Sequence, residues 1–294
     1  MTNDLPCISV VIPNLNQRDR LAKTLEAFRS QSYPSDRIEI IVIDNGSSDG
    51  SQEVAKYYDA RLRIFESRKN PYICRNIGIR TARYHWIALT DSSCIPNENY
   101  LLEMTSVHQN ADLVVGERDF EVSKDSTLGE IVDSLHFMRN HEFLNTRTVF
   151  PTGTMFFHRS LVDEIGYFRE DMRSGADFIW TDKVKRAGKC IAYAAKAKVL
   201  YAGTSFPRLF RKAHRDGWGH GTMAREKGTF SWLDGVWRLR PPSPNYVRYI
   251  LANRGKPEYR SRLISIWFGL WAYRVVFNLG RMHIGKSWFR SPPF

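Results

Sequence analysis

Three apolar segments in the first hundred residues each end in small polar side chains. The segments and the residues that follow them are 8–13 with Asn14 and Asn16, 38–43 with Asp44, and 85–90 with Asp91. Near-continuous apolar runs of this length, bounded by Gly, Pro, Asn and Ser, are typical of strands buried on both faces of a parallel sheet. This feature restricts the first part of the chain to an α/β fold.

Segments with helical periodicity lie between these strands. In residues 18–31, one helical face carries Leu21, Leu25 and Phe28. The other elements predicted in this region are helices at 51–58 and 73–82 and a short strand at 62–65. The alternation of strand and helix predicts a doubly wound, mostly parallel sheet.

The polar strand ends indicate a ligand site. In open α/β sheets, ligands bind beyond the carboxyl ends of the strands. Asp and Asn also begin turns and cap helices for purely local reasons, which is the alternative interpretation. Three such ends close together in the chain favour a pocket that Asp44 and Asp91 help to line, and therefore an enzyme.

Beyond Pro96 the alternation becomes less regular. The predicted elements are a helix at 98–109, a strand at 112–115, an apolar segment at 149–157, helices at 159–165 and 177–186, and mixed signals at 191–200. We interpret residues 115–154 as exposed, variable surface. The Pro-rich stretch 240–244 is the best linker candidate.

Positive charge is concentrated in the last third of the chain. The 294 residues carry a net charge of +12. Residues 1–202 contain 26 Lys and Arg against 27 Asp and Glu, whereas residues 203–294 contain 17 against 4. Six of the eight tryptophans lie in that third: Trp218, Trp232, Trp237, Trp267, Trp271 and Trp288. This combination suits an anionic membrane surface or a nucleic acid, and the absence of a recognised nucleic-acid-binding motif favours the membrane.

Two features predict a cytoplasmic protein. The segment from Met1 to Pro6 is short and polar, unlike a signal peptide. The four cysteines show no paired or metal-type spacing, so we expect reduced thiols at Cys7, Cys74, Cys94 and Cys190.

The order and spacing of several motifs resemble the family 2 glycosyltransferases over roughly residues 7–220. The matching segments are the Pro-x-x-Asn turn in Ile8–Asn16, the Asp-Asn-Gly-Ser-Ser-Asp segment in Ile40–Gly50, Arg75-Asn-Ile-Gly, the Asp-x-Asp position in Leu89–Pro96, and Gly175-Ala-Asp177 with Lys185–Gly188 after it. The resemblance implies a Rossmann-like GT-A fold and an enzyme that transfers a hexose from a nucleoside-diphosphate sugar.

The resemblance also implies roles for single residues. Asp44 would bind the nucleotide base, Asp91 would contact the ribose or a metal-bound diphosphate, and Asp177 would be the general base. A carboxylate in hydrogen-bond reach of an acceptor hydroxyl removes its proton as the new bond forms, and direct attack inverts the anomeric centre. The implied donor-binding set is Pro13, Asn14, Asn16, Asp44, Asn45, Ser47, Arg75, Asn76, Asp91, Ser92 and Ser93. Thr152, Gly153 and Thr154 would line the acceptor side, although a Thr-Gly-Thr turn needs no such role.

Three positions depart from the family pattern. Ser93 replaces the second carboxylate of the Asp-x-Asp motif, Ala176 replaces the Glu before the base, and the region of Tyr201 lacks the metal-binding His of many relatives. A Mn²⁺ or Mg²⁺ ion prefers anionic oxygen ligands, so the requirement for a divalent cation, with Asp91 as its ligand, stays open.

A basic stripe follows this region. Arg208, Arg211, Lys212 and Arg215 fall on one face of a predicted helix. We predict that these cations help to neutralise the diphosphate of the donor or of a lipid-linked acceptor. A solvated or membrane-facing stripe is an alternative with at least equal support.

An apolar helix is predicted at 263–279. Its length of about 25 Å is shorter than the ~30 Å hydrocarbon core, and Arg274 interrupts it, so we do not expect it to span a membrane. One face carries Arg260, Trp267, Trp271, Arg274, Asn278 and Arg281. That face suits a membrane interface, with a core helix and a homodimer contact as the alternatives.

We therefore predict a GT-A domain at 1–220, with a nucleotide-binding half at 1–97 and an acceptor half at 98–220, and a basic, Trp-rich helical region at 221–294. The predicted function is an inverting glycosyltransferase that acts on a saccharide or lipid-linked saccharide in cell-surface polysaccharide or glycolipid synthesis, peripheral at the inner face of the cell membrane. The alternative is a catalytically weak relative that binds nucleotide sugar or glycan as a regulatory or scaffold subunit.

Overall fold

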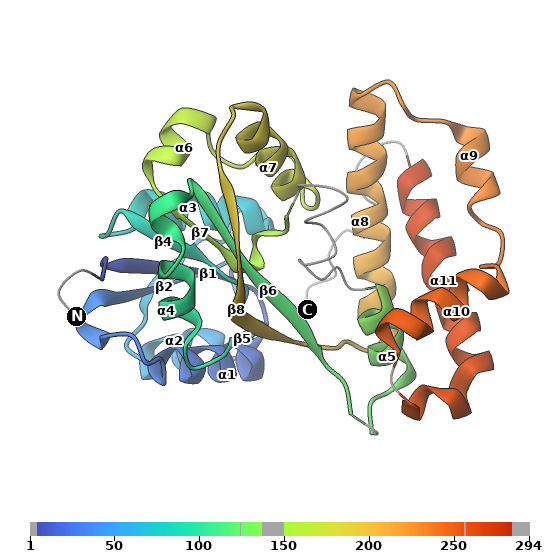
Figure 1. Cartoon of the computed structure of the whole chain (residues 1–294), viewed down its shortest axis with the longest axis horizontal. Helices are drawn as coiled ribbons and strands as arrows, with labels where there is room; N and C mark the ends of the chain where they lie inside the picture. The colour runs from blue at the N-terminus through green and yellow to red at the C-terminus, as the bar shows by residue number, and fades with distance from the viewer. Residues whose placement is uncertain (1–4, 124, 137–149, 256, 284–294) are drawn as a thin grey trace. The chain divides into compact units, whose positions relative to one another are not determined.

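The computed structural model describes residues 5–123, 125–136, 150–255 and 257–283 of the chain. The chain divides into two compact units (Figure 1). Among the described residues, the first unit contains those up to 119 and those from 150 to 201, and the second contains 120–136 and 202–283. Trp288 and the first residue of the apolar segment predicted at 149–157 lie outside the described residues.

One sheet of eight strands is formed by the described residues, in the order β3-β2-β1-β4-β7-β6-β8-β5 (Figure 1). The strands are β1 (Ile8–Asn14), β2 (Ile38–Asp44), β3 (Arg61–Ile64), β4 (Trp86–Leu89), β5 (Cys94–Pro96), β6 (Leu113–Glu121), β7 (Met155–His158) and β8 (Ile191–Ala202). The pairs β1–β2, β1–β4 and β2–β3 are parallel, and β7 is antiparallel to both β4 and β6. Because β6 therefore runs in the direction of β1 to β4, the predicted mostly parallel sheet is confirmed.

Helices cover both faces of this sheet in the first unit. The helices of this unit are α1 (Arg18–Arg29), α2 (Ser51–Tyr57), α3 (Pro71–Thr81), α4 (Tyr100–Thr105), α6 (Ser160–Ile165) and α7 (Ala176–Arg186). On one face, alternate residues of β1 such as Val10 share a core with Leu25 of α1 and Met104 of α4. On the other face, α3 lies so close that a Cβ added to Gly78 would come 2.2 Å from the Val11 side chain.

The segment predicted as exposed surface at 115–154 is different in its described part. Strand β6 continues to Glu121, and α5 (Leu128–His136) follows it. Residues 115–118 and most of α5 are buried. The prediction was wrong because Glu117 and Arg118 make the end of β6 look polar, although both side chains are less than 8% exposed.

The second unit is helical. Besides α5 it contains α8 (Phe206–Glu226), α9 (Trp232–Trp237), α10 (Pro244–Arg254) and α11 (Leu263–Met282). A separate apolar core joins four of these helices through residues such as Val132, Leu209, Ile250 and Leu270. Helix α11 is long and apolar enough to cross a membrane by length and composition, and 28% of its most apolar 18 residues are buried.

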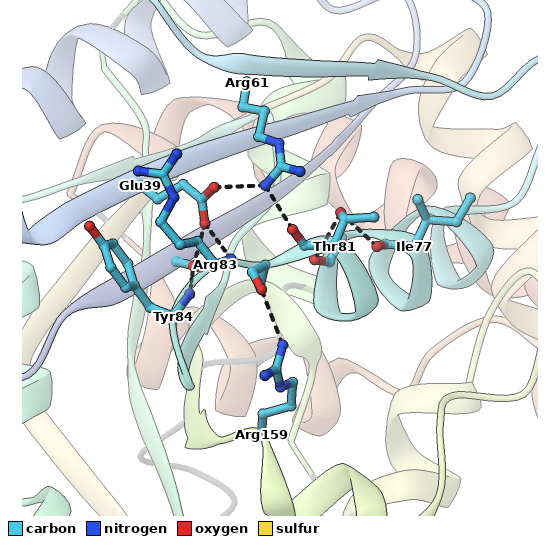
Figure 2. A network of polar contacts seen from close by, with 10 residues as sticks. Glu39, Arg61, Ile77, Thr81, Arg83, Tyr84 and Arg159 are labelled. Carbon is cyan, nitrogen blue, oxygen red and sulfur yellow. Dashed lines mark hydrogen bonds and ion pairs between the residues drawn. The ribbon is translucent and has the colours of Figure 1, made fainter.

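A polar network ties the amino-terminal ends of the strands to the end of α3 (Figure 2). The buried Glu39 of β2 accepts hydrogen bonds from Arg61 of β3 at 2.9 Å, from the Ser9 hydroxyl at 2.6 Å and from the Arg83 backbone amide at 2.8 Å. Arg61 also donates to the Thr81 carbonyl at 2.8 Å. This network stabilises the amino-terminal ends of the strands, away from the polar residues that follow their carboxyl ends.

Candidate active site

Asp44 is the centre of the turn that follows β2. Its side chain is fully buried and accepts hydrogen bonds from the side chains of Asn14 at 2.9 Å, Ser47 at 2.6 Å and Gln52 at 3.1 Å. The backbone amides of Gly46 and Ser47 donate to it at 3.1 and 2.7 Å. Because five donors occupy its two oxygens, the observed contacts of Asp44 organise the loop. Its predicted contact with a nucleotide base stays a prediction.

The end of β1 is built onto the same turn. Pro13 is buried in the strand, and Asn14 also donates to the Ser47 hydroxyl at 3.2 Å. The Asn16 backbone amide donates to that hydroxyl at 2.9 Å, and the Asn16 side-chain oxygen accepts from the Ser48 amide at 2.9 Å. The sequence-predicted residues of β1 and β2 therefore form one interlocked loop pair.

Two further predicted donor-binding residues have local partners. The Asn45 side chain donates to the carbonyls of Phe65 at 2.7 Å and Arg68 at 3.2 Å, and accepts from the Asn70 amide at 2.8 Å. The fully buried Asn76 side chain uses its amide group on Phe168 and Glu170. Both asparagines hold loops around the site, and their contact with a donor stays a prediction.

Arg75 and Asp91 form an ion pair between α3 and the end of β4. The Arg75 guanidinium donates to Asp91 Oδ1. The Arg75 side chain is 6% exposed and the Asp91 side chain is 26% exposed, so the carboxylate is the part that solvent reaches. Burial lowers the pKa of Arg75, but the charges of Asp91 and Asp177 outweigh burial and raise it, so the guanidinium stays charged.

Asp177 lies in the first turn of α7, beside this pair. Its carboxylate accepts hydrogen bonds from the Tyr72 hydroxyl at 2.9 Å and from the Phe178 backbone amide at 3.1 Å. Burial raises the pKa of Asp177, and the Arg75 charge and the hydrogen bond from Tyr72 only partly oppose this rise. A buried carboxylate with a raised pKa is the kind of group that acts as a general base.

The predicted acceptor-side residues lie next to both carboxylates. Residues Thr152–Thr154 form a short 3-10 helix. A hydrogen bond from the Thr152 backbone amide lowers the pKa of Asp177. A Cβ added to Gly153 would lie 3.2 Å from Asp91 Oδ2. Ser92 and Ser93 are buried, with exposed fractions of 6% and 8%. The structure thus brings Arg75, Asp91 and Asp177 together with this helix.

Sequence reasoning missed two residues of the site. Tyr72 lies three positions before Arg75 on α3, so helical spacing alone would have placed both on one face. Arg118 was missed because the strand containing it was predicted to end at residue 115. A charged residue continuing the register of a buried strand was the signal available for Arg118.

The predicted basic stripe lies in the second unit, on α8. Lys212 pairs with the buried Asp133 at 2.8 Å, and Arg215 pairs with Asp216 at 3.2 Å. Arg211 donates to the Pro207 carbonyl at 3.3 Å, and Arg208 is exposed. These contacts are structural, and the proposed role of the stripe in diphosphate binding stays a prediction.

Comparison with known families decides the class of this site. A family model described as glycosyl transferase family 2 matches residues 9–166, which is more than half of the chain. The chain belongs to this family. The predicted family, the family 2 glycosyltransferases, and the predicted enzyme class, a glycosyltransferase, are confirmed.

Known proteins match the chain over different lengths. Glycosyltransferase AglE of Haloferax volcanii is 29% identical over 96% of this chain and 97% of its own length. A chondroitin synthase of Escherichia coli is 31% identical over 41% of this chain, and the match spans 19% of that protein. The mannosyltransferase PcManGT of Pyrobaculum calidifontis, solved with GDP-Man and Mn²⁺, has a TM-score of 0.58, with 15% identity and coverage of 94% of this chain and 88% of its own. This likeness confirms the GT-A fold.

The residues at the Asp-x-Asp position of this family 2 chain fit a divalent cation poorly. Asp91 Oδ1 is engaged by Arg75, and Ser93 offers a hydroxyl where a hard cation favours an anionic oxygen. Within the described residues, no group of three or more His, Cys, Asp or Glu side chains could hold a metal ion.

Proposed function

We propose that this family 2 glycosyltransferase transfers a sugar from a nucleoside-diphosphate sugar to a hydroxyl of a saccharide or lipid-linked saccharide, with inversion, in the synthesis of a cell-surface polysaccharide or glycolipid. Asp177 is the general base in this proposal, and Arg75 with Asp91 belongs to the donor site. The structural neighbour solved with GDP-Man supports a nucleotide-sugar donor, and the similarity to a chondroitin synthase supports a polysaccharide product.

The environment of Asp177 is the observation that supports this proposal most. Burial raises the pKa of its carboxylate, which makes the ionised form a stronger proton acceptor than an ordinary aspartate. Tyr72 fixes the direction of the carboxylate, and the backbone amide of Thr152, a residue predicted for the acceptor side, also hydrogen-bonds to it. The acceptor proton then moves to Asp177 as the acceptor oxygen attacks the anomeric carbon.

Turnover measurements on an Asp177→Asn variant test the proposal. UDP- and GDP-sugars are screened with the wild type for binding, hydrolysis and transfer. We expect the variant to lose about 10²- to 10⁴-fold in turnover while its donor affinity changes less than about threefold, because asparagine keeps the shape but cannot accept the proton. The matched control is Asp182→Asn on the same helix, where the carboxylate pairs with Arg186 near solvent. Full turnover in Asp177→Asn contradicts the proposal.

The same screen distinguishes the second candidate function. Ser93 and Ala176, which depart from the family pattern, favour a weakly catalytic relative that binds nucleotide sugar or glycan as a scaffold or regulatory subunit. Donor binding in the wild type without hydrolysis or transfer to any saccharide or lipid-linked acceptor supports that candidate. Turnover that depends on Asp177 excludes it.

We also infer that the second unit attaches the enzyme to an anionic membrane at its inner face, beside a lipid-linked acceptor. Helix α9 exposes four large apolar side chains, namely Trp232, Leu233, Val236 and Trp237, at 51–75%. Helix α11 adds Leu263, Ile264 and Phe268 at 44–75%. The basic composition of residues 203–294 supports an anionic surface, since each cation near it contributes on the order of 1 kcal/mol.

The predicted membrane face of α11 is corrected by its contacts. The indole nitrogens of Trp267 and Trp271 donate to the carbonyls of Pro242 at 3.0 Å and Leu239 at 2.8 Å. Arg274 donates to the Arg238 carbonyl at 2.7 Å. These side chains therefore pack the 238–242 segment onto α11, and the exposed apolar residues belong to α9 and to the first turns of α11, at Leu263, Ile264 and Phe268.

Co-sedimentation with vesicles tests the membrane surface. We expect the full chain to bind vesicles that contain phosphatidylglycerol and to lose at least about tenfold in binding on the double substitution Trp232→Ser and Trp237→Ser. Tyr57→Ser, which removes a 76% exposed side chain in the first unit, is the control. Equal binding by both variants contradicts the inference. A dimer seen without vesicles that the double substitution disrupts supports the homodimer alternative instead.

A further inference from the structure

A second guanidinium group lies near Asp91. Arg118 of β6 is only 7% exposed. A Cβ added to Gly153 would lie 3.2 Å from Asp91 Oδ2 and 3.8 Å from Arg118 Nε. These two atoms therefore lie within about 7 Å of each other, the sum of the two distances. Because Arg75 holds Asp91 Oδ1, two guanidinium groups lie near this carboxylate.

Arg118 also lies near Tyr201 and near Cys94, the neighbour of Ser93, where the sequence departs from the metal-ligand pattern that the resemblance implies. Its guanidinium carbon is 5.7 Å from the centre of the Tyr201 ring. Tyr201 is the register partner of Cys94, the residue directly after Ser93. The pKa of the Cys94 thiol is raised to about 12 because burial and the Asp91 charge raise it by more than the Arg118 charge lowers it. The charges of Asp91 and Arg118 therefore both influence this thiol.

We propose that Arg118, together with Arg75, is a diphosphate-binding residue that supplies positive charge in place of a divalent cation. The Pyrobaculum mannosyltransferase, by comparison, was solved with both GDP-Man and Mn²⁺. This inference rests on the proposed function. In the transfer, the bond between the anomeric carbon and the β-phosphate oxygen breaks, the acceptor oxygen forms the new bond, and the acceptor proton goes to Asp177. The electron pair of the broken bond stays on the diphosphate, and fixed guanidinium groups stabilise that growing charge.

Arginine is suited to this role at a buried position. The guanidinium group keeps its charge at all physiological pH values and offers a planar set of donors that matches phosphate oxygens. A charge interaction is stronger in the low-dielectric interior than in water. The Asp91 side chain is 26% exposed, so solvent reaches the carboxylate that lies beside the buried guanidinium of Arg75.

Binding of UDP and GDP to the full chain by calorimetry, in EDTA and in Mn²⁺, tests the inference. We expect wild-type affinity for the preferred diphosphate to differ by less than about threefold between the two conditions. Arg118→Gln should weaken diphosphate binding about 10- to 100-fold, the range of a lost charge-assisted hydrogen bond. The affinity of Arg118→Lys should lie between those of the wild type and Arg118→Gln. Binding of the matching free nucleoside, uridine or guanosine, should be unchanged in Arg118→Gln. Arg186→Gln, at a 72% exposed side chain, is the control.

Four results overturn the inference, and they have different meanings. Diphosphate binding that is unchanged in Arg118→Gln shows that Arg118 does not bind the diphosphate, while the proposed function stands. Diphosphate binding that EDTA abolishes and Mn²⁺ restores shows a metal-dependent site, so the arginine role fails while the proposed function stands. Equal loss of nucleoside and diphosphate binding in Arg118→Gln shows a structural role for Arg118 instead. If neither UDP nor GDP binds the wild type in either condition, the proposed function itself fails, and the inference fails with it.

Discussion

At the scale of single residues, Asp44 and Asp177 are two buried aspartates in opposite environments. Five donors surround the carboxylate of Asp44, including two backbone amides of its own turn. Asp177 accepts from Tyr72 and from one backbone amide, and burial raises its pKa. A carboxylate saturated by local donors stabilises a loop, whereas one held at a raised pKa beside an ion pair is ready to accept a proton.

Asp177→Asn should make the protein more stable at neutral pH. A group whose pKa is raised on folding contributes stability that is fully present below its unfolded pKa of about 3.8 and is lost as pH rises through the folded value. At pH 7 the buried negative charge of Asp177 therefore lowers the free energy of unfolding of the wild type, and asparagine removes that charge. Denaturant unfolding at several pH values measures this difference, which should shrink as pH falls toward 3.8. A variant that is less stable at pH 7 contradicts the prediction.

Asp44→Asn should destabilise the protein by about 1–3 kcal/mol, because the amide nitrogen of asparagine cannot accept from the donors that surround that position. Chemical denaturation measures the loss. Binding of UDP and GDP to the folded variant separates the two roles of Asp44. Unchanged stability with a lost preference between the two bases would instead support a direct contact with the nucleotide base.

At the scale of elements, the helix pair of the second unit depends on glycine. A Cβ added to Gly217 of α8 would come 1.9 Å from the Phe277 carbonyl oxygen of α11, and one on Gly221 would come 2.1 Å from the Arg281 carbonyl oxygen. Figure 1 shows the two helices side by side. The sequence indicated α8 and α11 by their periodicity, but the close approach of their backbones depends on residues distant in the chain.

Gly217→Ala should therefore destabilise the second unit by about 1–3 kcal/mol, since the added methyl group must push the helices apart. The sign is opposite to that expected in an open helix, where replacing Gly by Ala stabilises by up to about 1 kcal/mol. Thermal unfolding of the full chain, followed by circular dichroism, measures the change. A variant with a higher melting temperature would show that the helices are not in such close contact.

Glu39 should make the first unit sensitive to acid. Burial raises the pKa of Glu39, but hydrogen bonds from Ser9, the Arg83 amide and Arg61 outweigh burial and lower the pKa below 4.5 (Figure 2). A lowered pKa contributes stability that is present above 4.5 and is lost as pH falls through the folded value. Glu39→Gln should thus be less stable than the wild type at pH 7 and closer to it in acid. Glu66→Gln, at an exposed position, is the control, and a constant difference at all pH values contradicts the prediction.

At the scale of the whole molecule, what could be predicted from the sequence depends on how local its causes are. The strands that end at Asn14, Asp44 and near Asp91 could be predicted because buried parallel strands leave continuous apolar runs. The five hydrogen bonds to Asp44 could not be predicted, because their donors come from the ends of β1 and β2 and from α2. The proposed role of Arg118 could not be predicted either, since Tyr201 and Gly153 are distant from it in the chain.

The two units also left different signals in the sequence. The family 2 model covers residues 9–166, and ordered motifs identify that part. The second unit lacks such motifs, so its interpretation depended on charge and tryptophan content. The membrane face of α11 was predicted from the sequence alone, which does not show that the 238–242 segment packs on that face. The match to AglE over 96% of this chain includes both units.

The anomeric configuration of the transferred sugar tests the central claim most directly. Transfer is run with the α-linked nucleoside-diphosphate sugar that the wild type uses, and proton NMR of the product gives the new linkage. Direct attack by a hydroxyl that Asp177 deprotonates predicts a β-linked product from the wild type and no detectable product from Asp177→Asn. An α-linked product, or the same product from the variant, would contradict an inverting transfer with Asp177 as its base.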